Sequence, residues 1–176
     1  MFILTAALIM IPAGEAPAYT LEPAGIDFYY LPEFLSPPVE GILSVETGAL
    51  AGQPNADGVT FGCYYWEMET PVSDKNLWIK EKLSSVMPPD LMEITHTSTP
   101  TWAEGSQAAE VPPGRSLGLM SEVGFTFFPQ NGVMGRGKAF GIFRNGYAVL
   151  LVVYGPNEAD PVGIIEQIVG MAVLSE

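Results

Sequence analysis

The chain has 176 residues, which favours a single domain with one substantial core. Nearly half of the residues (48%) are hydrophobic and only 15% are charged, so the composition excludes an intrinsically disordered protein. The net charge is −13, and no Lys or Arg precedes Lys75. Such a charge distribution repels phosphate backbones and anionic lipid headgroups, so nucleic acid and acidic membrane surfaces are disfavoured as partners.

The first residues have the pattern of an export signal. Residues 2–11 form an apolar run too short to span a bilayer, and Ala16-Pro17-Ala18 supplies the small residues expected before a cleavage point. No basic residue precedes the run, which a true start upstream of Met1 would explain. We expect a signal peptide over residues 1–18 and a single domain over 19–176, in a secreted or periplasmic protein. The alternative is a cytoplasmic protein in which this run is a strand or helix packed on the domain.

The next part of the chain predicts strands followed by a helix. Segments between Pro and Gly, the last of them rich in aromatic and β-branched residues, predict strands at 26–31, 42–45 and 59–68. Apolar residues at helical spacing then predict a helix that Ser73 or Asp74 caps and Pro88-Pro89 ends.

The second half repeats this order. Apolar runs predict strands at 91–97, 117–128, 133–143 and 147–154. Asn145-Gly146 is typical of a type I′ hairpin turn, and Asp160-Pro161 is typical of a helix start. The buried stripe of this last helix is expected to contain Ile164, Ile165, Ile168, Val169 and Met171. Strands interrupted by two helices predict an α+β fold, an antiparallel sheet covered by helices.

The strand at 147–154 has no polar alternation, so both of its faces should be buried. We expect Val149, Leu151 and Val153 to face one side of the sheet, and Leu150 and Val152 to face the other.

One connection, residues 98–115, has no strand or helix period and is longer than most loops in compact domains. Trp102 lies in it with Glu104 and Glu110, and we interpret these three residues as a candidate partner-binding site. An aromatic anchor in an acidic rim suits a basic or carbohydrate-like partner. The alternative is that Trp102 only pins the loop onto the sheet.

No catalytic, cofactor or metal site is predicted. There is no G-x-S-x-G motif, and one His with one Cys cannot form the usual zinc sites. Cys63 lies in an apolar run, where a buried Cys acts as a small hydrophobic residue, although a catalytic pair with His96 stays open.

Two weaker patterns have structural interpretations. Gly135-Arg136-Gly137-Lys138 lacks the spacing of a phosphate-binding loop and is read as the start of a strand. Glu67 and Glu69 project from one face of a strand, where they are read as solvated rather than as an acid–base or Ca²⁺ pair.

Residues 137–156, GKAFGIFRNGYAVLLVVYGP, followed by IIEQIV at 164–169, resemble the C-terminal part of Mog1/PsbP-like proteins. The resemblance implies an antiparallel sheet sandwiched by helices, and a non-enzymatic scaffold or binding role, as in most members. The first half departs from the family, because it has Tyr30-Leu31-Pro32-Glu33-Phe34 in place of the usual Pro-Gly-Trp-like opening. No functional residue carries over.

The sequence therefore predicts an exported, non-enzymatic binding or scaffold protein of the bacterial cell envelope, with a protein or small ligand as partner and no cofactor. The alternative is a small-ligand carrier whose pocket is lined by the aromatic residues Tyr29, Tyr64, Trp66 and Tyr147. A hydrolase without a recognised motif is a third hypothesis.

Overall fold

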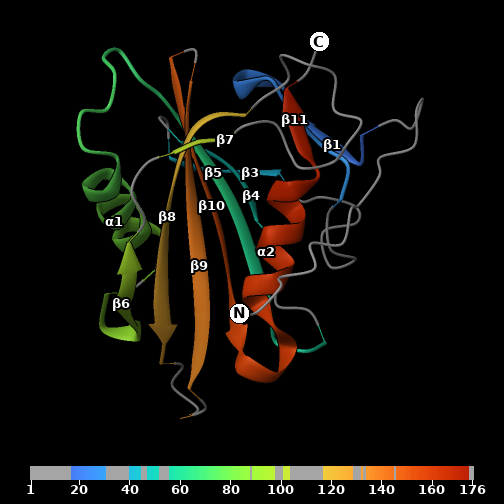
Figure 1. Cartoon of the computed structure of the whole chain (residues 1–176), viewed down its shortest axis with the longest axis vertical. Helices are drawn as coiled ribbons and strands as arrows, with labels where there is room; N and C mark the ends of the chain where they lie inside the picture. Colours follow the sequence, from blue (N-terminus) through green and yellow to red (C-terminus); the bar gives the residue numbers. More distant parts are fainter. Residues whose placement is uncertain are drawn as a thin grey trace, which may run out of the picture.

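A long antiparallel sheet forms the middle layer of the protein (Figure 1). The computed structural model describes residues 17–30, 40–44, 47–51, 56–87, 89–97, 101–103, 117–128, 132, 134–144 and 146–174. The sheet has eight strands in the order β3-β4-β5-β10-β9-β8-β6, and β7 pairs with β8 beside this path. Its strands are β3 (Glu40–Ser44), β4 (Thr47–Ala51), β5 (Thr60–Glu67), β6 (Met92–Thr97), β7 (Thr101–Ala103), β8 (Gly118–Phe127), β9 (Gly135–Arg144) and β10 (Tyr147–Pro156).

The two helices lie on opposite sides of this sheet (Figure 1). Helix α1 (Lys75–Val86) packs on β8, β9 and β10, and α2 (Pro161–Gly170) packs on the other face of β9 and β10. A small three-stranded sheet, β1 (Tyr19–Leu21), β2 (Ile26–Phe28) and β11 (Ala172–Leu174), lies beside α2. The predicted α+β class, an antiparallel sheet covered by helices, is confirmed.

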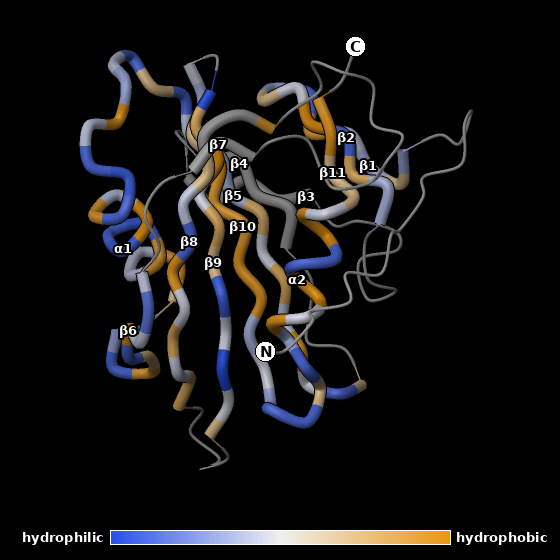
Figure 2. Tube along the Cα trace, viewed as in Figure 1, coloured by the Kyte–Doolittle hydropathy of each residue, from blue (hydrophilic) through white to orange (hydrophobic). Residues whose placement is uncertain are grey.

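Strand β10 separates two hydrophobic cores, and its tube in Figure 2 is orange along most of its length. Val149, Leu151 and Val153 belong to the core under α2, whereas Leu150 and Val152 belong to the core under α1. All five side chains are at most 1% exposed. The predicted two-sided burial is therefore confirmed.

Both helices begin where the sequence predicts. Asp74 caps α1 by accepting a hydrogen bond from the backbone N–H of Leu77, at 2.9 Å. Asp160 caps α2, because its side chain accepts a hydrogen bond from the backbone N–H of Gly163. Pro161 occupies the first helical position, where a backbone N–H would have no partner within the helix. In the predicted stripe of α2, Ile165, Ile168 and Val169 are buried, while Ile164 and Met171 are only partly buried.

The structure adds strands that the sequence does not predict. These are β1, β4, β7 and β11, each of three to five residues, and they are recognisable only through their pairing with neighbouring strands. The expectation that residues 98–115 contain no strand is wrong for Thr101–Ala103, which pair with Met120–Gly118. Strand β2 ends at Phe28 rather than Leu31, and Leu31 lies outside the described residues.

The expected signal peptide stays a prediction. Residues 1–16 of the expected signal peptide lie outside the described residues, and Tyr19 is the first residue of β1. Within the described ranges, no helix is both long and apolar enough to cross a membrane.

Candidate functional site

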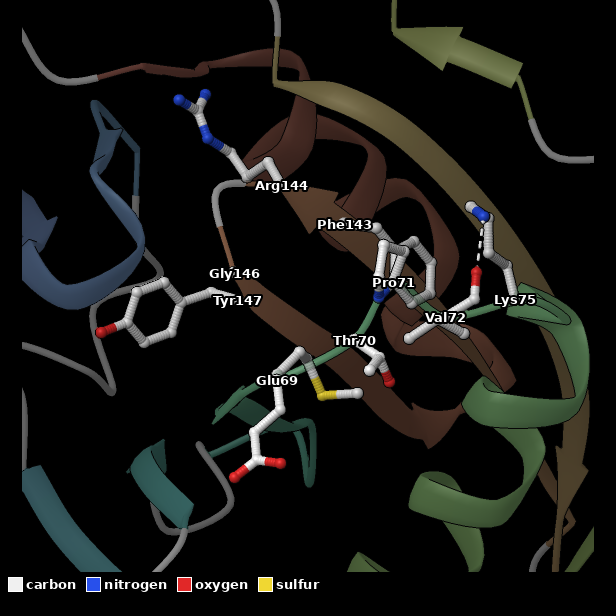
Figure 3. A pocket seen from close by; sticks show the side chains of 10 residues that line it. Glu69, Thr70, Pro71, Val72, Lys75, Phe143, Arg144, Gly146 and Tyr147 are labelled. Carbon is white, nitrogen blue, oxygen red and sulfur yellow. Dashed lines mark hydrogen bonds between the residues drawn. The ribbon is translucent and has the colours of Figure 1, made fainter.

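A hollow of about 440 Å³ opens at the end of the large sheet, where the chain before α1 passes the hairpin of β9 and β10 (Figure 3). It is called the sheet-end hollow below. Its lining combines apolar, aromatic and charged side chains: Met68, Glu69, Thr70, Pro71, Val72, Lys75, Phe143, Arg144, Gly146 and Tyr147.

The hairpin turn gives the hollow its shape. Gly146 has φ of +77°, as the second residue of the predicted Asn-Gly turn requires, while Asn145 itself lies outside the described residues. The carbonyl oxygen of Gly146 accepts a hydrogen bond from Met68 N at 2.6 Å, which ties the crossing segment to the turn. A Cβ built on Gly146 would have only Met68 O nearby, at 3.9 Å, so the turn leaves open space beside it.

The apolar wall of the hollow is continuous with the core under α1. The Phe143 ring contacts Trp78 of α1 edge-on, with centroids 5.2 Å apart at 75°. Trp78 in turn lies edge-on to Trp66 of β5, at 5.3 Å. Edge-to-face contacts of this kind fix ring orientation, so the Phe143 wall is held in place by packing rather than by the hollow itself.

Two cations line the hollow on opposite sides of Phe143 and Gly146 (Figure 3). Lys75 Nζ donates to Val72 O at 2.9 Å and lies 5.6 Å from the Phe143 ring centroid. Arg144 Nε is shielded from solvent and, among the described residues, has no hydrogen-bond partner. Burial lowers the pKa of the Arg144 guanidinium. No described carboxylate lies within ion-pair distance of either cation.

A second hollow, of about 560 Å³, lies on the α2 face between β6 and the start of α2. Its cations are neutralised locally. Lys138 Nζ lies 3.2 Å from Glu122 and 2.7 Å from Glu166, and Arg136 lies 3.5 Å from Asp160. The two hollows therefore differ in electrostatics, because only the sheet-end hollow has cations without carboxylate partners among the described residues.

The strand register connects Trp102 to Phe143, a residue that lines the sheet-end hollow. Trp102 of β7 pairs with Leu119 of β8, which pairs with Phe143 of β9, so one cross-strand row joins Trp102 to the wall of the hollow. Glu104 and Glu110, the other two residues of the predicted partner-binding site, lie outside the described residues.

The four aromatic residues of the carrier hypothesis do not line one pocket. Tyr64 and Trp66 pack in the core under α1, and burial raises the pKa of Tyr64 to about 12. Tyr147 packs against the core under α2 and also lines the sheet-end hollow. Tyr29 is partly buried beside the small sheet, where its N–H bonds to Met171 O at 3.0 Å.

The open hypothesis of a Cys63–His96 pair is wrong. Cys63 is 0% exposed on β5, where burial raises its thiol pKa to about 12. His96 lies on β6, and three strands separate β5 from β6 in the sheet. The His96 side chain is exposed, with Nε2 3.8 Å from Glu122. The thiol therefore behaves as the predicted small hydrophobic residue.

The first of the two weaker motifs lies as predicted, whereas the prediction that Glu67 and Glu69 project from one strand is wrong for Glu69. The run Gly135-Arg136-Gly137-Lys138 is the start of β9. Glu67 and Glu69 are both exposed, and Glu69 lies beyond the end of β5 at the rim of the sheet-end hollow. In the described part of the chain, no three His, Cys, Asp or Glu side chains group as metal ligands would.

Sequence reasoning missed Lys75, Phe143 and Arg144 as site residues. The available signal was the position of Arg144 directly before the predicted Asn-Gly turn, since side chains next to a hairpin turn lie at the end of a sheet.

Comparison of the sequence with models of known protein families gives no match, and comparison with curated proteins gives none either. The geometry of the sheet-end hollow is therefore the main indication of function.

Proposed function

We propose that this protein is a non-enzymatic binding protein of the bacterial cell envelope, and that the sheet-end hollow is its binding site. The observation that carries the proposal is the pairing of an apolar, aromatic wall with two cations that have no carboxylate partner in the described structure. Residues 137–169 resemble Mog1/PsbP-like proteins. Most members of that family are non-enzymatic, which agrees with the proposed role.

The size and lining of the hollow support a binding role. Small-molecule sites typically have volumes of roughly 300–1,000 Å³ and mostly apolar walls with a few polar groups that orient the ligand. The sheet-end hollow has about 440 Å³, with Phe143, Pro71 and Val72 as apolar lining. The Phe143 wall is positioned by its packing on Trp78 in the core under α1, so a ligand would bind to a preformed surface.

The test is an NMR titration of the full chain with a library of small fragments, mapped on backbone amide resonances. We expect shifts to concentrate at residues 68–75 and 143–147. Residues 95–96 and 136–138 of the second hollow serve as an internal control and should stay unchanged. Shifts spread over the surface, or confined to the second hollow, would contradict the proposed site.

Export is the second part of the proposal, and it is supported by the apolar run and the Ala16-Pro17-Ala18 pattern. The mature protein is expected to start at Tyr19. Intact-mass analysis of the protein from the envelope or exported fraction of its native host tests this. A mass that retains residues 1–18, or recovery from the cytosol alone, argues against export.

A scaffold role for a protein partner is the second candidate, and β7 favours it. This short strand pairs with β8 at the margin of the sheet, and its Trp102 shares a cross-strand row with Phe143. A partner that contacts β7 would lie two strands away from Phe143 in this row.

A further inference from the structure

Two side-chain N–H groups of the described structure are buried without a hydrogen-bond partner, Trp78 Nε1 and Arg144 Nε, and only Arg144 carries a charge. Its Nε is shielded from solvent without a hydrogen-bond partner, although burying an unpaired donor of a charged group is costly. Arg136, on the same strand, differs in both respects, because its side chain is 51% exposed and lies 3.5 Å from Asp160. The Arg144 Nε–H can therefore donate to an external acceptor, because the described part of the chain supplies none.

The neighbours of Arg144 leave room for such an acceptor. Tyr147 is its direct cross-strand partner, so the two side chains share one face of the hairpin, as Figure 3 shows. Gly146 lies between them in the chain and has no side chain to fill the space. The Glu69 carboxylate, the only acidic group among the described lining residues, points away from Arg144 (Figure 3).

The charges favour an anion over a neutral acceptor. Lys75 adds a second positive charge to the lining, and neither cation is neutralised by a described carboxylate. The net charge of −13 opposes anions at long range, but this repulsion decays over a Debye length of about 8 Å at physiological ionic strength. Beside Tyr147, the nearby Arg144 guanidinium therefore dominates, and Lys75 contributes from the other side of Phe143.

We propose that the sheet-end hollow binds a small organic anion, with Arg144 on the anionic group and Tyr147, on the same face of the hairpin, against the apolar part. This inference rests on the proposed binding site and adds the chemical class of the ligand. A guanidinium presents a planar fork of donors that matches an oxyanion, which is the geometry of carboxylate and phosphate recognition. The aromatic lining adds the requirement for an apolar body, which inorganic phosphate lacks.

The experiment compares 3-phenylpropionate with 3-phenylpropionamide, its uncharged counterpart of nearly the same shape, and with octanoate and inorganic phosphate. Binding to the full chain is measured by calorimetry and by amide shifts at residues 143–147. We expect the two organic acids to bind about tenfold or more tightly than the amide, because a charge-assisted hydrogen bond is lost in the amide. Phosphate should bind more weakly than the organic acids.

Arg144→Gln and Arg136→Gln form a matched pair of variants. The first should weaken 3-phenylpropionate binding about tenfold or more, and the second should leave it unchanged. If Arg144→Gln does not fold, the acid–amide comparison on the unaltered protein decides the question. Equal binding of acid and amide in the hollow overturns the anion inference but leaves the proposed binding site standing. Failure of both organic acids to shift residues 143–147 also overturns the inference, whereas fragments that bind only elsewhere overturn the binding site itself.

Discussion

Lys138 of β9 joins the large sheet to α2 through Glu166, with Nζ 2.7 Å from Oε1. The same ammonium lies 3.2 Å from Glu122 of β8, and only 14% of the Lys138 side chain is exposed. Burial alone would lower the pKa of Lys138, but the hydrogen bond to Glu166 and the charges of Glu122 and Glu166 outweigh it, so the pKa rises above 10.5. This cluster therefore helps to hold α2 on the sheet while the lysine is protonated.

The first prediction concerns the pH dependence of this contact. A cation whose pKa is higher in the folded state contributes stability that is complete below the unfolded pKa, 10.5, and is lost as pH rises through the folded value. Glu166→Gln should cost about 0.2–1 kcal/mol at pH 8, because the partner carboxylate is exposed. The difference from the unaltered protein should shrink above pH 10.5. Urea unfolding from pH 8 to pH 12 measures it.

Glu158→Gln is the matched control, because Glu158 is an exposed carboxylate on the same side of the fold. It should leave the free energy of unfolding unchanged at every pH in this range. A Glu166→Gln difference that grows above pH 10.5 would contradict the assigned sign.

The second prediction concerns the core under α2. Leu151 is 0% exposed at the centre of β10, so Leu151→Ala should cost about 2–5 kcal/mol through lost burial and the cavity left behind. Leu77→Ala removes the same atoms at a side chain that is 52% exposed, and should cost well below that. Urea unfolding of both variants compares them. Equal costs would show that β10 is not buried on this face.

The third prediction concerns Cys63. Its pKa of about 12 leaves about one thiol in ten thousand ionised at pH 8, and the residue is also inaccessible. A thiol reagent such as dithionitrobenzoate should therefore not react with the native protein at pH 8 over an hour. It should react within minutes in concentrated urea. Rapid reaction of the native protein would place Cys63 at the surface.

The parts of the fold that depend on local chemistry were predictable from the sequence. The caps Asp74 and Asp160 and the turn at Gly146 act within a few residues, so the sequence reveals them directly. The unbroken apolar run of β10 likewise required a covered strand.

The site depends on contacts between distant segments, so the sequence did not reveal it. Lys75 and Phe143 meet only because α1 packs across β9, and no pattern in either segment records this. The isolation of Arg144 from carboxylates is also a property of the folded chain. Strand β7 was missed for the same reason, because three residues form a strand only through pairing with β8.

The last prediction tests whether Trp102 recognises a partner. If it does, Trp102→Ala should leave the thermal midpoint within a few degrees, since about 1 kcal/mol shifts the midpoint of a domain this size by roughly 2–4 °C. The same change should weaken capture of an envelope protein, identified with the unaltered chain, by about tenfold, or about 1.4 kcal/mol. Trp66→Ala is the matched control, because Trp66 is only 8% exposed in the core under α1 and should lose about 3–5 kcal/mol of stability. If Trp102→Ala lowers the midpoint as strongly as Trp66→Ala, Trp102 serves the core. If it remains stable and captures the same partner equally well, Trp102 does not recognise this partner.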